Sequence, residues 1–123
     1  MDHISIGDAE LAIMKVVWKA KAPVTSLDIG KAVEEKGWKK TTIATFLTRL
    51  VEKGALAAEK QGKLYYYTPL LSEKDHRKAQ TRHLIQSLYN GSVRDFAAAL
   101  FEEQELSQRD VQELRAIFDE KEE

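Results

Sequence analysis

Residues 39–54 read KKTTIATFLTRLVEKG, and this stretch decides the fold. Its apolar residues recur at the spacing of an α-helix and form one stripe that would be buried: Ile43, Phe46, Leu47, Leu50 and Val51. The opposite side is polar and consists of Lys40, Thr41, Thr42, Ala44, Thr45, Thr48 and Arg49. Gly54 supplies the residue that can adopt the left-handed conformation at the end of a helix. The pattern predicts an amphipathic helix with an unusual polar side.

That polar side favours contact with nucleic acid over a solvated surface. Four threonines are a poor choice for an exposed helix, because β-branched side chains lose rotamer freedom there. Short hydroxyls beside an arginine and lysines suit a helix that lies against phosphates and base edges. We therefore interpret this stretch as a recognition helix.

Two predicted helices precede it. Gly7, with Glu10 three residues later, predicts the start of a helix over residues 8–20. After a break at Ala22-Pro23, Thr25 and Asp28 predict the start of a second helix. Its expected apolar side consists of Leu27, Ile29, Ala32 and Val33, and Gly37 is expected to close it. Trp38 in the connection is expected to pack between the second and third helices. Helix, short turn and helix are the outline of a helix-turn-helix.

A β-hairpin is predicted after the third helix. Residues 56–59 and 64–68 are extended runs, and the polar segment 60–63 between them contains Gly62. Lys60 and Lys63 stand at its tip, where they would contact a nucleic-acid backbone. Ordinary turn lysines on a solvated hairpin are the alternative, but the position directly after a recognition helix favours the wing of a winged helix-turn-helix.

Three more helices are predicted beyond Pro69, at about 73–89, 93–103 and 108–120. Their starts repeat the cap-plus-acid spacing in Ser72 with Asp75, Ser92 with Asp95, and Ser107 with Asp110. The apolar faces of this arm are too large for so thin a structure to bury alone, so a partner copy is expected to cover them. The candidate dimerisation residues are Leu84, Leu88, Phe96, Leu100, Phe101, Val111, Leu114, Ile117 and Phe118.

The sequence thus predicts a mostly α fold with a small β-hairpin wing. We divide it into a winged-helix DNA-binding domain at 1–71 and a three-helix dimerisation region at 72–123. The first part holds 11 basic and 8 acidic residues, and the second holds 8 basic and 12 acidic residues. A local basic patch on a near-neutral protein is typical of a nucleic-acid reader.

Composition and motifs argue against several other classes. At 123 residues with 32% charged residues, the chain reads as folded and soluble. No apolar run approaches the ~20 residues of a membrane span and no signal-peptide pattern is present, so we expect a cytoplasmic protein without a membrane partner. There is no cysteine, and His76 and His83 lack further ligands at metal-binding spacing. No phosphate-binding glycine loop or nucleophile elbow occurs. We expect no catalytic residues, no metal and no cofactor.

The motifs together resemble the BlaI/MecI penicillinase repressors and the related CopY copper-responsive repressors, over nearly the whole chain. The resemblance rests on Ala9, Glu10, Met14 and Trp18, on residues 41–50 with Lys53 and Gly54, on the tyrosines of the second wing strand, and on residues 88–91, 106–107 and 113–114. It implies a homodimeric repressor that dimerises through its C-terminal helices, binds inverted-repeat operators with TACA/TGTA-like half-sites, and blocks transcription.

The resemblance also implies roles for single residues. Thr42, Thr45 and Arg49 match the family's DNA-facing positions. Thr41 and Ala44 stand where relatives often carry a lysine and a basic residue, which changes the expected base contacts. Lys39 and Lys40 just upstream are expected to contact phosphates.

The inducing signal does not follow from the resemblance. The CopY-type relatives sense metal through C-terminal cysteines, which this chain lacks. The penicillinase repressors are inactivated by proteolysis at an Asn-Phe bond in the fifth helix. The corresponding pair here is Ala99-Leu100, an ordinary core pair that does not favour a sensor protease as partner.

Two other functions stay open from the sequence. A winged helix can serve as a protein-interaction module, since a fold alone does not fix function. A small-molecule-responsive regulator, with a pocket between wing and arm, is the other alternative.

Overall fold

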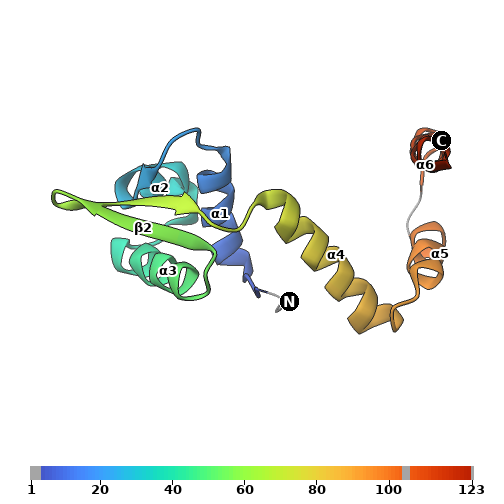
Figure 1. Ribbon diagram of the computed structural model, residues 1–123, viewed down its shortest axis with the longest axis horizontal. Coiled ribbons are helices and arrows are strands. Elements are labelled where there is room, and N and C mark those ends of the chain that lie inside the picture. Colours follow the sequence, from blue (N-terminus) through green and yellow to red (C-terminus); the bar gives the residue numbers. More distant parts are fainter. Residues whose placement is uncertain (1–3, 104–105, 123) are drawn as a thin grey trace. The chain divides into compact units, whose positions relative to one another are not determined.

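The computed structural model describes residues 4–103 and 106–122. The chain divides into two compact units, Met1–Gln80 and Thr81–Glu123. The elements follow in the order α1 (Asp8–Lys19), β1 (Val24–Thr25), α2 (Ser26–Ala32), the 3-10 turn η1 (Glu34–Lys36), α3 (Lys40–Glu52), β2 (Leu56–Gln61), β3 (Leu64–Pro69), α4 (Glu73–Tyr89), α5 (Val93–Glu103) and α6 (Gln108–Glu122). The expectation of a mostly α fold with a β-hairpin wing is confirmed (Figure 1).

Local hydrogen bonds fix the starts of α1 and α2, as their sequences predict. The Gly7 N–H donates to Glu10 Oε1 at 2.9 Å at the start of α1. At α2 the capping is reciprocal, because Thr25 N–H donates to Asp28 Oδ2 at 3.0 Å and Asp28 N–H donates to Thr25 Oγ1 at 3.2 Å. The backbone and side chain of Thr25 thereby hold the pKa of Asp28 below its usual value.

The same device begins each of the last three helices. The N–H groups of Asp75, Asp95 and Asp110 donate to the hydroxyls of Ser72, Ser92 and Ser107 at 3.0, 3.1 and 3.1 Å. Helix α4 ends at Asn90 and Gly91, whose φ angles of 51° and 83° are left-handed. The helices predicted at 73–89, 93–103 and 108–120 are therefore confirmed, with α6 continuing to Glu122.

A three-stranded antiparallel sheet in the order β1-β3-β2 completes the first unit. Val24 and Ala58 both lie opposite Tyr67 of the central strand. The core beneath it includes these fully buried side chains: Ile13, Met14, Ile29, Leu47, Leu50 and Leu56. The apolar stripe of α3 is confirmed, since Ile43, Leu47 and Leu50 are buried and Phe46 and Val51 pack against the same core.

The prediction of the apolar side of α2 is partly wrong. Ile29 and Val33 enter the core, but Leu27 is 54% exposed and Ala32 is also exposed. Leu27 lies two residues before Ile29, which is about 200° around a helix, so both cannot face the same core. The helix also ends at Ala32, and Gly37 closes the 3-10 turn that follows, with a φ of 68°.

Trp18 ties the first residues of α4 to the rest of the first unit. Its indole Nε1–H donates to the carbonyl oxygen of Leu71 at 2.8 Å. Its ring lies 5.6 Å from that of His76, which is only 6% exposed. A long-range hydrogen bond and a buried ring therefore fix where α4 begins.

The second unit leaves many apolar side chains at its surface. Leu88, Phe101, Ile117 and Phe118 are 70%, 56%, 54% and 65% exposed. Tyr89 and Phe96 meet edge to face at 5.6 Å where α4 turns into α5. In the described part of the chain, no helix is both long and apolar enough to cross a membrane.

Candidate nucleic-acid interface

The outward side of α3 is polar and open to solvent. Lys40, Thr41, Thr45, Thr48 and Arg49 are exposed, and Thr42 is half-buried. Lys39, the residue before the first turn of α3, is also exposed. All seven residues proposed on this helix are therefore on or next to its accessible side, although which of them touch DNA stays a prediction.

Two of the threonine hydroxyls of α3 are oriented by the helix itself. Thr45 Oγ1 donates to the Thr41 carbonyl at 3.0 Å, and Thr48 Oγ1 donates to the Ala44 carbonyl at 2.9 Å. A hydroxyl has one hydrogen, so its lone pairs and the γ-methyl group remain for an external partner. In the major groove, amino groups of adenine and cytosine and the thymine methyl group complement such a surface.

Three cations, Lys39, Lys40 and Arg49, stand beside these hydroxyls. Among residues 4–103 and 106–122, no ion pair involves Lys39, Lys40 or Arg49. An exposed cation without a carboxylate partner keeps its full charge for a phosphate or for guanine. This side of α3 thus carries both positive charge and hydrogen-bonding groups.

Lys53 behaves differently and holds α3 in place. Its Nζ lies 2.6 Å from Glu10 Oε1 and 2.7 Å from the Ser5 carbonyl oxygen. Burial of Glu10 acts to raise its pKa, but the hydrogen bonds from Lys53 and the Gly7 N–H, helped by the charges of Lys53 and Arg49, outweigh burial. The pKa of Glu10 consequently lies below its usual value, and the pair links the end of α3 to the start of α1.

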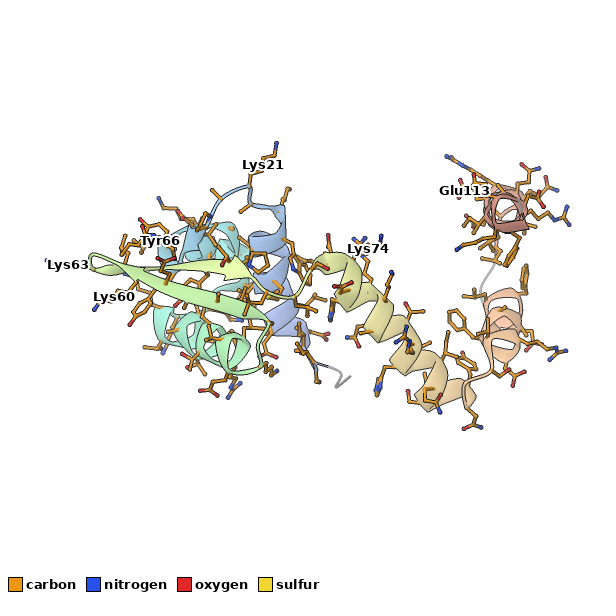
Figure 2. The ribbon with its side chains drawn as sticks, in the orientation of Figure 1. Lys21, Lys60, Lys63, Tyr66, Lys74 and Glu113 are labelled. Carbon is orange, nitrogen blue, oxygen red and sulfur yellow. The ribbon has the colours of Figure 1, made fainter. Side chains whose placement is uncertain are left out.

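The hairpin extends the basic surface away from the helices (Figure 2). Gly62, with a φ of 66°, forms its turn, and Lys63 follows at the tip. Lys60 lies opposite Tyr65 on the neighbouring strand, with its Nζ 5.9 Å from the centre of the tyrosine ring. Both lysines are exposed, as expected of a wing.

Tyr67 anchors the base of this wing. Its ring packs against the core, and burial raises its pKa, with a further contribution from Tyr65. Alternation along β3 then leaves Tyr65, two residues nearer the tip, on the same face as Tyr67 but 50% exposed. The wing therefore has one end fixed in the core and one end free.

Three features were missed from the sequence. The Lys53–Glu10 pair joins residues 43 apart, and no local pattern marks it. The Lys60–Tyr65 contact could have been found from the hairpin register, which places the two residues opposite each other. A pocket between α2 and α3 depends on how the helices pack.

Nothing in the described residues suggests a metal centre, because no three His, Asp or Glu side chains there are grouped as metal ligands. Of the candidate dimerisation residues, Leu84, Leu88, Phe101, Ile117 and Phe118 are exposed, and the other four are half-buried. Whether a second copy covers them stays a prediction.

Comparison with known proteins gives a consistent result. Residues 6–120 match the family described as penicillinase repressor. The penicillinase repressor of Bacillus licheniformis is 35% identical over 115 residues, which cover 94% of this chain and 90% of that protein. The methicillin resistance regulatory protein MecI of Staphylococcus aureus is 30% identical over 116 residues, which cover 94% of each chain.

Two solved structures resemble part of the chain. The solution structure of the DNA-binding domain of the repressor BlaI matches with a TM-score of 0.54 and 39% identity, over 60% of this chain and 90% of that one. The structure of monomeric Bacillus licheniformis BlaI in complex with the blaP half-operator matches with a TM-score of 0.51 at the same identity and coverage.

Proposed function

Because the chain belongs to the penicillinase repressor family, we propose that it is a DNA-binding transcriptional repressor acting in the cytoplasm. The observation that carries this proposal is the outward side of α3, where three cations that form no ion pair within the described residues flank two threonines oriented by their own helix. A relative at 39% identity in the corresponding domain is described as bound to a half-operator, which supports the same use of this domain here.

Helix α3 would enter the major groove. Thr42, Thr45 and Arg49 would meet base edges or flanking phosphates, and Thr41 and Thr48 would line the same contact. Lys39 and Lys40, at the start of the helix, would neutralise phosphates on one side. The wing lysines Lys60 and Lys63 would reach the backbone beyond the groove.

A homodimer would present two such helices to an inverted repeat. The exposed apolar side chains of α4, α5 and α6, such as Leu88, Phe101 and Phe118, support this assembly. Covering them with a second copy would remove apolar surface from water, which is favourable in free energy. Two-fold symmetry would place the recognition helices at half-sites about one duplex turn apart.

Proteolytic induction is not part of this proposal. Ala99 and Leu100 are half-buried within α5, and an Ala-Leu pair departs from the Asn-Phe bond at which the family resemblance would place cleavage.

The test is a titration of labelled DNA with the full chain, at low and moderate salt. The probes are an inverted TACA/TGTA repeat, DNA from upstream of the protein's own gene, and scrambled DNA of equal length. We expect tight binding to one specific probe with two protomers per duplex, and an affinity that falls steeply with salt as counterions are released. Absence of binding to all three probes at low salt would contradict the repressor function and favour the protein-interaction module.

A further inference from the structure

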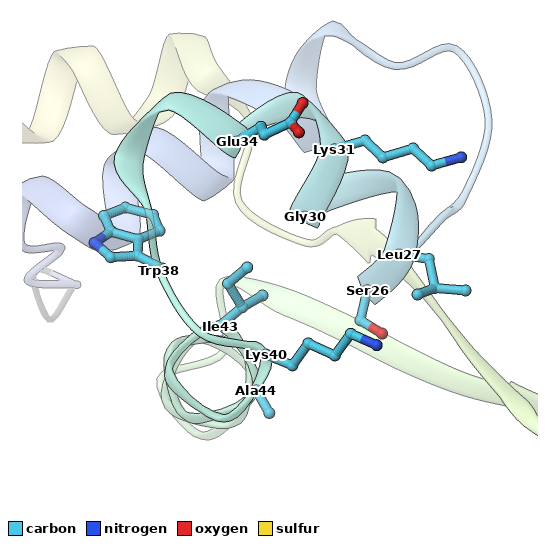
Figure 3. A pocket seen from close by; sticks show the side chains of 9 residues that line it. All are labelled: Ser26, Leu27, Gly30, Lys31, Glu34, Trp38, Lys40, Ile43 and Ala44. Carbon is cyan, nitrogen blue, oxygen red and sulfur yellow. The ribbon is translucent and has the colours of Figure 1, made fainter.

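A pocket of about 310 Å³ lies between α2 and α3 of the helix-turn-helix (Figure 3). Its size is at the lower end of the range of small-molecule sites, roughly 300–1,000 Å³. The residues that line it are Ser26, Leu27, Gly30, Lys31, Glu34, Trp38, Lys40, Ile43 and Ala44. Of these lining residues, only Lys40 and Ala44 also belong to the outward side of α3 that is proposed to bind DNA.

The body of the pocket is apolar and aromatic. Trp38 is half-buried and meets Phe46 edge to face at 5.2 Å, so its ring is held in one orientation. Ile43 is 6% exposed, whereas Leu27 at the rim is 54% exposed. A flat apolar group placed here would cover Leu27 and pack against Ile43, which removes apolar surface from water.

Gly30 keeps one wall of the pocket open. It lies inside α2, where alanine is the better helix former. A Cβ at this position would meet only Ile43 Cδ1, at an ordinary 3.8 Å, so packing does not exclude a side chain. A larger residue at position 30 would project into the space that the pocket occupies.

The mouth of the pocket carries excess positive charge. Figure 3 shows the Lys40 side chain running toward the start of α2, where Ser26 and Leu27 lie. Lys31 and Glu34 of α2 add one cation and one carboxylate to the lining, so the lining retains a net positive charge. An ammonium and a hydroxyl beside an apolar cleft suit a carboxylate attached to a ring.

We propose that this pocket binds a fused-ring aromatic monocarboxylate, and that the bound acid displaces DNA. The ring would lie between Ile43 and Leu27, with its carboxylate at Lys40. Displacement follows because Lys40 and Ala44 belong to the outward side of α3, and this second part rests on the proposed function. The protein would then respond to a small organic acid without cleavage of the chain.

The test uses 2-naphthoate as the probe and the full chain labelled with nitrogen-15. We expect saturable amide shifts at Gly30, Ile43 and Ala44 and a shift of the Trp38 indole N–H, with a Kd of about 1 mM for a ligand of this size. The neutral analogue 2-naphthalenemethanol should bind at least several-fold more weakly. Scattered shifts, no shifts, or equal affinity for the neutral analogue would overturn the proposed ligand chemistry.

Two variants locate the site. Gly30→Leu fills the pocket and should abolish binding, whereas Ala32→Leu adds the same side chain to an exposed position of the same helix outside the pocket and should not. Leu27→Ser changes a largely exposed residue, leaves the core intact and should weaken binding several-fold. Full affinity in both Gly30→Leu and Leu27→Ser would overturn the site.

A DNA titration at saturating naphthoate tests displacement. We expect the operator affinity to fall at least tenfold in the wild-type chain and to stay unchanged in Gly30→Leu. Unchanged wild-type affinity would overturn displacement. If the protein binds naphthoate at the pocket but binds no DNA even without it, the pocket stands and the proposed repressor function fails.

Discussion

Lys53 Nζ, at the end of α3, lies 2.6 Å from Glu10 Oε1, in the first turn of α1. The Glu10 side chain is only 8% exposed, and it also accepts the Gly7 N–H that begins the helix. One carboxylate therefore caps α1 and fixes the far end of the proposed recognition helix. Two predictions concern this pair.

Replacement of Lys53 by methionine should lower the free energy of unfolding by about 1–3 kcal/mol, because a buried carboxylate then loses its charged partner. Chemical denaturation at neutral pH measures this loss of unfolding free energy. Arg77→Met is the matched control, since the Arg77–Glu73 pair is 73% and 41% exposed and should contribute less than about 0.5 kcal/mol. Equal, small losses in both variants would contradict a stabilising role for Lys53.

The stabilisation by Glu10 should depend on pH. Its folded-state pKa lies below the ordinary value of 4.5, so its charged form stabilises the fold in full above pH 4.5 and this contribution is lost as the pH falls through the folded-state pKa. The difference in unfolding free energy between the wild type and Glu10→Gln should be constant near neutral pH and shrink below pH 4.5. A difference that stays constant into acid would contradict this linkage.

Local order was predictable where side chains act on their own backbone. The cap of Thr25 with Asp28 and the three serine caps depend on residues three apart, so the sequence contains all of the information. The buried stripe of α3 follows from helical spacing in the same way. The family resemblance was also recognisable from the motif of the third helix at residues 41–50, with supporting patterns elsewhere in the chain.

Long-range relationships were not predictable. Leu27 is apolar but points outward, because Ile29 and Val33 determine which side of the short helix α2 meets the core. The Lys53–Glu10 pair and the Trp18–Leu71 hydrogen bond join residues 43 and 53 apart. Periodicity predicts which side of a helix is buried but does not identify the element that packs against that side. The pocket between α2 and α3 depends on that packing and was therefore not predictable from the sequence.

Arg49 should matter for operator recognition. It is exposed on α3 without a carboxylate partner among the described residues, so Arg49→Ala should weaken binding by about 1–3 kcal/mol. Arg94→Ala, an arginine of α5 whose side chain is 88% exposed, is the control and should leave affinity unchanged. Anisotropy titrations of the folded, dimeric variants measure both operator affinities. If Arg49→Ala and Arg94→Ala bind the operator equally well, Arg49 does not belong to the interface.

The wing lysines should contribute charge without sequence preference. The double change Lys60→Gln and Lys63→Gln should weaken binding to specific DNA and to scrambled DNA by similar factors. It should also reduce the slope of log affinity against log salt by about 2 per protomer, since each phosphate contact contributes about 0.9. A wing that does not touch DNA would leave the slope as it is in the wild type.

The apolar surface of α6 should hold the dimer together. Phe118→Asp places a charge where a 65% exposed aromatic ring would otherwise be covered, so sedimentation should show monomers at concentrations where the wild type is dimeric. Gln112→Asp introduces the same charge at a polar, exposed position of α6 and should remain dimeric. A Phe118→Asp variant that sediments as the wild type does would place the interface elsewhere.

The central claim is that the outward side of α3, together with the wing, is the surface that meets DNA. The most direct measurement is amide chemical-shift mapping of the full chain with its operator duplex. We expect the largest shifts in residues 39–49 and 60–65, with small shifts in α1 and in the first turns of α4. Large shifts confined to other surfaces, with residues 39–49 unchanged, would contradict the account.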